Sequence, residues 1–298
     1  MAEQVNWREA LPGLEVYERE PLRAHTTFRI GGPARWLLCP KTEEEAEGIL
    51  RVCHENGIRP FFLGNGSNIL AADEGYDGVV LSTARLDGLS RRGGEIVAGS
   101  GVSLAKLAHF AAEHSLTGLE FAQGIPGSVG GGVRMNAGAY GGELKDAVAW
   151  VEAVDETGEK RRISPEDCNF SYRHSIFCRE PLFITAACFA LKPGEPAAIR
   201  AAMEDFAQRR RDKQPLNYPS AGSTFKRPEG HFAAALIDQC GLKGLRIGGA
   251  QVSEKHAGFV VNVDNATAAD VLAVMEEVKK QVAARTGVAL EAEVEFLG

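Results

Sequence analysis

The stretch GIPGSVGGGVRMNAGAYGGE (124–143) carries the strongest structural signal in the chain, because eight of its twenty residues are glycine. Glycine loses more conformational freedom on folding than any other residue, so such a segment needs a compensating interaction. Ile125, Val129, Val133 and Met135 interleave with the glycines, whereas flexible linkers are polar. We therefore favour a backbone that approaches a ligand closely, with a pyrophosphate as the usual candidate, over a flexible surface loop.

A second segment of this kind is LGNGSNIL (63–70), which directly follows the strand-like PFFL (60–63). Its Gly, Asn and Ser residues tolerate a left-handed backbone and offer successive N–H groups, the geometry of an anion-binding nest. Taken alone, this segment fits a ligand site and a flexible loop equally well. Neither segment is the GxGxxG that opens a βαβ unit, so the sequence does not predict a Rossmann fold.

Helical and strand-like patterns alternate along the chain. Thr42 followed by Glu45 is a capping box that opens a helix, which Gly57 can end. Ser103 is a candidate cap for a further helix. The best strand candidates are VAWVEAV (148–154) and FITAACFAL (183–191).

A charged amphipathic helix is expected over roughly 195–212, and QPLNYPSAGS (214–223) then interrupts the pattern. We place a domain boundary there. Beyond it we expect a helix near 230–240, strands near 246–263, a helix capped by Thr267 and a final strand near 290–296. The pattern predicts an α+β fold, with two α/β modules before the boundary and one after it.

Composition excludes several classes of protein. The chain has 298 residues and a net charge of −7, with hydrophobic residues at 44%, which is ordinary for a globular protein and argues against nonspecific nucleic-acid binding. The six cysteines form no CxxC pair, and His174 and His256 have no metal-ligand spacing. We expect buried free thiols and no metal.

The start, MAEQVNWREA, has no apolar signal core, and no stretch approaches the ~20 apolar residues of a membrane helix. The sequence therefore predicts a soluble, cytoplasmic protein.

A family resemblance rests on seven strings in chain order: FRIGG (28–32), LGNGSNIL, GIPGSVGGGVRMNAGAYGGE, FSYRHSIF (170–177), AGSTFK (221–226), GLRIGGAQVSEKHAGFVVN (244–262) and LEAEVEFLG (290–298). Together they resemble the UDP-N-acetylenolpyruvoylglucosamine reductase family across nearly the whole chain. The short spacing between FSYRHSIF and AGSTFK is similar to the shorter, second type of this reductase.

The resemblance implies the FAD-binding fold of vanillyl-alcohol-oxidase-like flavoproteins, with two α/β subdomains that hold the flavin and a C-terminal α+β domain that covers the substrate. It implies subdomain 1 at 1–84, subdomain 2 at 85–214 and the substrate domain at 215–291. The last strand, 292–298, is a candidate addition to subdomain 1.

The resemblance also implies the chemistry: NADPH reduces FAD, and the UDP-sugar UDP-N-acetylenolpyruvoylglucosamine is then reduced at its enolpyruvyl group. Ser223 in AGSTFK corresponds to the proton donor of the family. Arg173 in FSYRHSIF can bind the substrate carboxylate with a two-pronged guanidinium. Glu293 in LEAEVE is expected to assist enol formation. Outside this context, each is more often a turn residue, a surface ion pair or a solvated strand position.

The remaining site residues come from the same motifs. The expected cofactor-binding residues are Arg29, Gly64, Asn65, Gly66, Ser67, Asn68, Gly124, Ile125, Pro126, Gly127, Ser128, Gly130, Gly131, Asn136, Ala137 and Gly138. Because segment 124–143 contains no His or Cys, we expect the FAD to be noncovalent. Tyr172, Arg210, Lys213 and Asn262 are weaker substrate-binding candidates. For Arg210 and Lys213 a solvated basic helix end is an equally good interpretation, and Tyr172 is also compatible with a core position.

Two other functions remain open on the sequence alone. One is a different flavoprotein oxidase or dehydrogenase of the same fold. The other is a nucleotide-sugar-binding protein that keeps the loops and has lost catalysis. The strings AGSTFK and LEAEVE favour the reductase over both.

Overall fold

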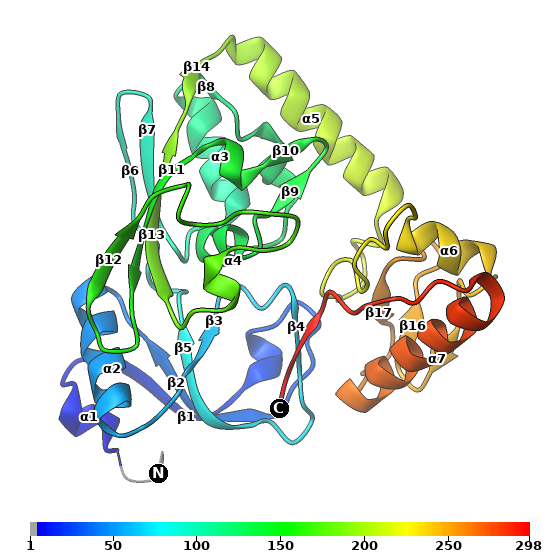
Figure 1. Cartoon of the computed structure of the whole chain (residues 1–298), viewed down its shortest axis with the longest axis horizontal. Coiled ribbons are helices and arrows are strands. Elements are labelled where there is room, and N and C mark those ends of the chain that lie inside the picture. Colours follow the sequence, from blue (N-terminus) through cyan, green and yellow to red (C-terminus); the bar gives the residue numbers. More distant parts are fainter. Residues whose placement is uncertain (1–4) are drawn as a thin grey trace. The chain divides into compact units, whose positions relative to one another are not determined.

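The structure is a computed structural model that describes residues 5–298 (Figure 1). The first four residues of MAEQVNWREA, on which the expectation of a missing signal core partly rests, lie outside the described residues. The chain divides into two compact units. Unit 1 is Met1–Glu18, Trp36–Asn65 and Gly78–Arg209, and unit 2 is Arg19–Arg35, Gly66–Asp77 and Arg210–Gly298. These ranges differ from the three predicted from sequence, whose division stays a prediction.

The larger sheet of unit 1 is antiparallel, with strand order β12-β11-β13-β7-β6. The strands are β6 (Leu89–Arg92), β7 (Glu95–Gly99), β11 (Val148–Val154), β12 (Lys160–Ile163) and β13 (Phe183–Ala190). The predicted strand VAWVEAV coincides with β11, and FITAACFAL is one residue longer than β13. Ala187 of β13 pairs with Val151 on one side and with Ala98 on the other, so it lies in the middle of the sheet.

Two helices bury their apolar sides against this sheet, α3 (Leu104–Glu113) and α4 (Val129–Arg134). Ser103 caps α3 as predicted, since its hydroxyl accepts a hydrogen bond from Lys106 N at 3.1 Å. Leu107 and Val133 are fully buried in one apolar core with Phe189 of the sheet. This core holds the segments that carry the site in unit 1.

A smaller sheet has the strand order β1-β2-β5-β3, and helix α2 (Glu43–Glu55) shares an apolar core with it. Its strands are β1 (Glu15–Pro21), β2 (Pro33–Cys39), β3 (Phe61–Leu63) and β5 (Tyr76–Ser82), and the short helix α1 (Trp7–Ala10) precedes them. Thr42 caps α2 as predicted, but the Glu45 carboxylate bonds to Lys41 N rather than completing the box on Thr42. Ile49 of α2 is buried in a core with Leu81 of β5.

The glycine-rich segment 124–143 is more regular than expected. No helix or strand was expected in this segment, but it forms the short helix α4 and the hairpin of β9 (Gly138–Ala139) and β10 (Gly142–Glu143). The reason is packing: a Cβ at Gly130 would lie 2.9 Å from the Ser100 Cβ, and one at Gly132 would lie 2.9 Å from the side chain of Leu144. Some of these glycines are therefore required by neighbouring protein atoms rather than by a ligand.

The other elements of unit 1 are short connections, apart from one long helix whose last residues, from Arg210 on, belong to unit 2. Strands β8 (Leu116–Thr117) and β14 (Lys192–Pro193) pair with each other. Single 3-10 turns occur at Glu120–Gly124, Leu144–Asp146 and Ile176–Cys178. Helix α5 (Pro196–Lys213) confirms the amphipathic helix predicted for this region, with Ile199 and Met203 buried.

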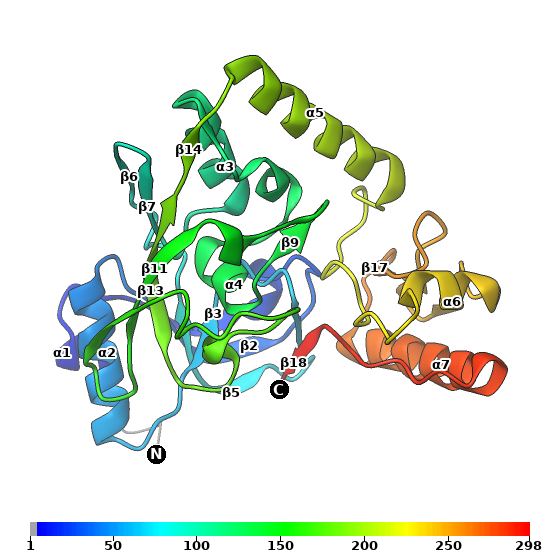
Figure 2. The same cartoon turned by 45° about the horizontal axis from the view of Figure 1, so that its top comes forward.

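Unit 2 has a three-stranded antiparallel sheet of β15 (Arg246–Ile247), β16 (Ala250–Val252) and β17 (Val260–Asn262), with α6 (Ala233–Gln239) and α7 (Ala268–Thr286). Figures 1 and 2 both show α6 beside α7. Val271, Val274 and Val278 of α7 are fully buried in the core of this unit. As predicted, Thr267 caps α7, in a capping box with Asp270.

The last strand joins a different part of unit 2. Strand β18 (Glu295–Leu297) runs parallel to β4 (Ile69–Ala71), with Phe296 opposite Leu70. It is shorter than the predicted strand near 290–296, because the residues before Glu295 bond instead to the segment around Thr224. No helix within residues 5–298 is long and apolar enough to cross a membrane.

Candidate active site

Four segments of unit 1 meet around Gly64. A Cβ at Gly64 would lie 2.7 Å from the Ser128 hydroxyl, so a side chain there would have to displace this hydroxyl from its place between the two glycine-containing segments. Thr83 donates its backbone N–H to the residue before Gly64 at 2.9 Å. Gly130 donates to the Ser100 carbonyl, also at 2.9 Å. The structure thus brings together the predicted cofactor residues Gly64, Ser128 and Gly130.

Two buried hydroxyls in this region lack hydrogen-bond partners within residues 5–298. The side-chain oxygens of Thr83 and Ser100 are buried and find no hydrogen-bond partner within residues 5–298. A buried unsatisfied hydroxyl is rare and calls for a ligand, an ion or a water. Both groups can donate to a phosphate or accept from a ring N–H. No sequence motif identifies these two residues, because the lack of a hydrogen-bond partner for each hydroxyl depends on tertiary packing.

Residues 66–70 of the LGNGSNIL segment belong to unit 2 and make protein contacts. Gly66 has φ +59°, and a Cβ there would overlap the His25 carbonyl. The Asn68 amide donates to the Glu293 carbonyl at 3.0 Å, and the Asn68 carbonyl accepts from Glu295 N at 2.9 Å. Asn68, predicted to bind the cofactor, therefore holds the C-terminal segment that carries Glu293.

Ser223 and Glu293 lie on adjacent backbone segments of unit 2. Glu293 N donates to the Thr224 carbonyl at 2.9 Å, and Phe225 pairs with Ala292 in an antiparallel bridge. The Ser223 side chain is exposed, and Glu293 is half-buried. Two predicted catalytic residues that are far apart in the sequence are thereby brought close together.

Thr224 fixes the backbone beside Ser223. This residue is fully buried, its N–H donates to Gly258 O at 2.8 Å, and its hydroxyl accepts from Val260 N at 2.9 Å. The preceding Gly222 has φ +75° in open space, so the chain turns there and then enters a fixed position. Ser223 thus projects into solvent from a rigid support.

Arg173, the third predicted catalytic residue, belongs to unit 1 and lies in a tight turn. Ser171 N donates to His174 O at 3.0 Å and His174 N donates to Ser171 O at 3.2 Å, which closes the turn over Tyr172 and Arg173. Arg173 has φ +53°, a left-handed conformation that disfavours side chains. Such strain is frequent at functional sites.

The guanidinium of Arg173 has an aromatic neighbour. It lies 5.3 Å from the ring centre of Tyr172, in a cation–π contact. The Tyr172 side chain is 51% exposed, so the alternative interpretation of Tyr172 as a core residue is wrong. Both side chains are accessible to a ligand from the tip of the turn.

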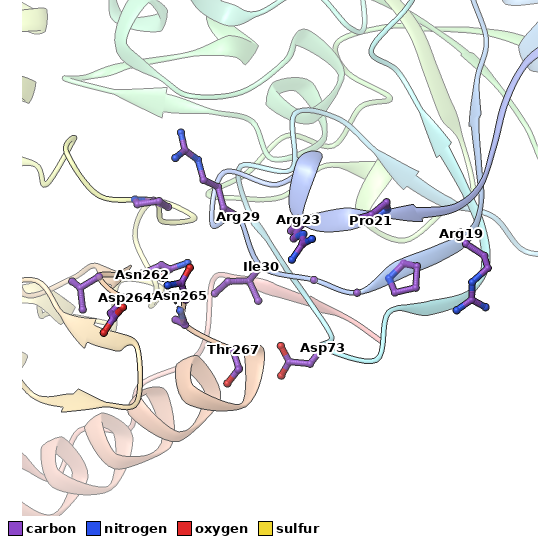
Figure 3. Close-up of a pocket in the computed structure, with 16 residues that line it drawn as sticks. Arg19, Pro21, Arg23, Arg29, Ile30, Asp73, Asn262, Asp264, Asn265 and Thr267 are labelled. Atoms are coloured by element: carbon purple, nitrogen blue, oxygen red, sulfur yellow. Dashed lines mark hydrogen bonds between the residues drawn. The ribbon is translucent and has the colours of Figure 1, made fainter.

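Arg29 and Asn262 line one pocket of unit 2, of about 880 Å³ (Figure 3). Arg19 and Arg23 also line it, but Figure 3 shows the three arginines spread along the pocket rather than converging. The Asn262 amide donates to Phe28 O at 3.2 Å and its oxygen accepts from Ala266 N at 2.8 Å. Its polar atoms therefore already have protein partners.

The two basic candidates at the end of α5 lie in unit 2. Lys213 is exposed and lies close enough to His256 that its charge helps to lower the pKa of His256, which burial lowers most. Arg210 is half-buried in the last turn of the helix. Lys255 donates to the carbonyl of Arg211 at 2.5 Å and so ties the helix end to the GLRIGGAQVSEKHAGFVVN segment.

The other predicted cofactor residues lie in the two glycine-containing segments. Gly124, Ile125, Pro126, Gly127, Gly131, Asn136, Ala137 and Gly138 belong to unit 1 together with Asn65, whereas Ser67 belongs to unit 2. All six cysteines are free, five of them buried and Cys178 partly so. Burial raises the pKa of the Cys53 and Cys168 thiols to about 12.

We call the region around Gly64, Ser128 and Gly130 in unit 1 the cradle, and its unpartnered hydroxyls of Thr83 and Ser100 are groups that a bound nucleotide could satisfy. A protein-family model described as "FAD binding domain" matches residues 34–164, and the buried free hydroxyls of Thr83 and Ser100 lie within that range. The chain is therefore a flavoprotein oxidoreductase with the predicted vanillyl-alcohol-oxidase-like FAD-binding fold, followed by a separate C-terminal domain.

The particular family follows from the C-terminal part and from whole-chain relatives. A second model, "UDP-N-acetylenolpyruvoylglucosamine reductase, C-terminal domain", matches residues 214–297. The reductase of Geobacillus kaustophilus is 46% identical over 100% of this chain and 98% of its own. That of Clostridium novyi is 46% identical over 95% of this chain and 92% of its own.

A solved structure supports the same family assignment. The crystal structure of the reductase from Thermus caldophilus has a TM-score of 0.82 at 34% identity, and the match covers 96% of this chain and 99% of that one. The chain belongs to the UDP-N-acetylenolpyruvoylglucosamine reductase family, the FAD-dependent reductases of peptidoglycan precursor synthesis. The resemblance seen in the sequence, including the shorter type, is confirmed.

Proposed function

We propose that this chain reduces UDP-N-acetylenolpyruvoylglucosamine to UDP-N-acetylmuramate with NADPH, through noncovalent FAD. Support comes from family membership and from the meeting of AGSTFK with LEAEVE, through Glu293 N to Thr224 O and the Phe225–Ala292 bridge. This pairing is the observation that carries the proposal, because it places a hydroxyl and a carboxylate on neighbouring rigid segments.

The residues proposed to hold FAD are those of the cradle, namely Gly64, Ser128 and Gly130, with the hydroxyls of Thr83 and Ser100. The unpartnered hydroxyls would gain hydrogen bonds from the cofactor. When bound, FAD accepts hydride from NADPH and supplies it to the methylene carbon of the enolpyruvyl group. The protein supplies the binding, the orientation and the charge described below.

Arg173 stabilises the charge that develops on the substrate. After hydride addition, negative charge is shared between the neighbouring carbon and its carboxylate. A guanidinium matches a carboxylate with two parallel hydrogen bonds and needs no reorganisation if it is held in place beforehand. The strained turn at φ +53° is such a preorganised support.

Ser223 donates the proton that completes the reaction. A hydroxyl is a weak acid in water, but a carbanionic acceptor nearby makes transfer favourable. Glu293 assists formation of the enol from its position on the neighbouring segment. The exposed Ser223 side chain leaves room for the enolpyruvyl group to reach it.

The proposal also covers the partners. NADPH and the UDP-sugar are the small-molecule partners, with Tyr172, Arg210, Lys213 and Asn262 as lesser candidates for contacts to them. A cytoplasmic location remains part of the proposal, because NADPH and nucleotide-activated sugars are cytoplasmic metabolites.

Anaerobic mixing with NADPH and then with UDP-N-acetylenolpyruvoylglucosamine, while flavin absorbance is followed, tests the proposal. We expect NADPH to bleach the flavin and the UDP-sugar to restore the colour. Bleaching by an alcohol or a hydroxy acid instead would favour an oxidase of the same fold. A flavin that neither reagent changes would favour a protein that only binds nucleotide-sugars.

The bound FAD is expected to be released by acid precipitation, because segment 124–143 offers no His or Cys for a covalent bond. The measurement is the flavin absorbance of the supernatant after trichloroacetic acid treatment, with the pellet as its control. Yellow colour that stays with the precipitated chain would contradict the noncovalent assignment.

Arg173→Lys should separate the two half-reactions. The variant keeps the positive charge and loses the two-pronged guanidinium, which a single ammonium does not replace. We expect flavin reduction by NADPH at a nearly normal rate, and reoxidation by the UDP-sugar slowed on the order of tenfold to a hundredfold. Stopped-flow absorbance measures both. Equal slowing of the two halves would mean that Arg173 has a structural role.

A further inference from the structure

We infer that Asn136 is a positioning residue for Arg173, acting through the carbonyl of Ser171 and the carboxylate of Glu143. The inference rests on the proposed role of Arg173 in binding the substrate carboxylate. All the residues concerned belong to unit 1.

The turn that carries Arg173 needs an external support. Its two backbone hydrogen bonds join only Ser171 and His174, and Arg173 has a left-handed φ of +53°. Two hydrogen bonds across a single turn do not hold such a conformation in water, since isolated hairpins are marginal. Something outside the turn must restrict its motion.

Asn136 supplies this support. Its side chain is 1% exposed, and the amide group donates to Ser171 O at 3.2 Å and to Glu143 Oε2 at 2.9 Å. Its oxygen accepts from Lys145 N at 3.1 Å. Both amide hydrogens and the oxygen are therefore used by protein groups, so the side chain is committed to the turn and not to the cofactor.

Glu143 adds charge to the support. Its carboxylate also receives the Lys145 ammonium at 2.7 Å. The pKa of Glu143 is lowered chiefly by the hydrogen bond from Lys145, with smaller contributions from Asn136 and from the positive charge of Arg173. Asn136 thus connects the backbone of the arginine turn to a carboxylate that interacts electrostatically with the arginine itself.

The segment after the turn is anchored separately. The Ser175 hydroxyl donates to Arg134 O at 2.6 Å, and the Cys178 thiol donates to the same oxygen at 3.2 Å. Because Arg134 ends helix α4, loss of the Asn136 side chain would free only the side of the turn before Arg173. The local fold should therefore survive the substitution while the arginine loses its fixed position.

Asn169→Ala is a matched control for Asn136→Ala. Both asparagines have left-handed backbones, with φ +41° at Asn136 and +49° at Asn169, so alanine introduces a similar backbone strain at each. Asn169 is exposed, and no hydrogen bond of its side chain is found within residues 5–298. A difference between the two variants reports the side-chain hydrogen bonds of Asn136.

The experiment is a double-mutant cycle with Arg173→Ala, measured on the FAD-loaded protein. We expect Asn136→Ala to slow reoxidation by the UDP-sugar by about tenfold to a hundredfold, with flavin content and NADPH reduction near those of Asn169→Ala. In the Arg173→Ala background the same substitution should have no further effect. An equal fold-loss in both backgrounds would overturn the inference, as would a variant that no longer retains FAD.

Amide hydrogen exchange provides a readout without turnover. Peptides covering 169–176 should exchange faster in Asn136→Ala than in Asn169→Ala, while residues 104–113 of helix α3 stay unchanged in both. Unaltered exchange in 169–176 would overturn the inference even if activity fell. If the wild-type flavin is not reoxidised by the UDP-sugar, the proposed function fails, and the exchange experiment still tests the support of the turn.

Discussion

Ser223→Ala is expected to lower turnover by on the order of a hundredfold to ten-thousandfold, the range of a lost general acid. The loss should lie in the second half-reaction alone, because the hydroxyl has no role before the substrate becomes anionic. Flavin content and NADPH reduction should match the wild type. Single-turnover reoxidation by the UDP-sugar is the measurement.

The position of Ser223 in the structure separates an effect on catalysis from an effect on stability. The Ser223 side chain is exposed and has no hydrogen bond within residues 5–298, so its removal should change the free energy of unfolding by less than about 0.5 kcal/mol. Ser223→Cys keeps a proton donor at the same position and should lie between wild type and alanine. Near-normal turnover of Ser223→Ala would remove Ser223 from the mechanism.

Much of the fold was predictable because local signals agreed with the final packing. Strand β11 matches its predicted range, and Thr267 caps α7, since an apolar run and a capping box need no information from elsewhere in the chain. Helix α4 was missed because glycine disfavours helices by about 1 kcal/mol per residue. Its stability comes from the Ser128 cap and from contact with Ser100 and Leu144.

The site was predictable only as a set of residue types. The motifs supplied Ser223, Arg173 and Glu293, but nothing in their spacing shows that Asn68 holds the segment of Glu293. The unpartnered hydroxyls of Thr83 and Ser100 and the hydrogen bond from Asn136 to Ser171 are equally invisible in the sequence, because burial and hydrogen-bond partners arise from residues distant in the chain. The motif predicts Asn136 as a cofactor-binding residue, whereas its side-chain hydrogen bonds in the structure are to Glu143, Ser171 and Lys145.

Gly66→Ala should destabilise the protein more than replacement of Gly64, the other glycine of the LGNGSNIL segment. Gly66 has φ +59°, and its missing side chain leaves room for the carbonyl of His25 and the Cα of Thr26. A left-handed alanine costs about 1–2 kcal/mol, and overpacking against fixed atoms costs a further 1–3 kcal/mol or so. We expect the free energy of unfolding to fall by about 2–5 kcal/mol.

Gly93→Ala separates the two contributions. Gly93 has nearly the same φ, +61°, but nothing lies within 4 Å of its added Cβ, so only the backbone strain remains and the loss should be about 1–2 kcal/mol. Urea unfolding followed by circular dichroism measures both variants in the same buffer, with FAD at saturating concentration. Equal losses would mean that the His25 carbonyl moves aside at little cost. A larger loss for Gly66→Ala would establish that this glycine is required by the protein's own backbone, whether or not a cofactor is bound beside it.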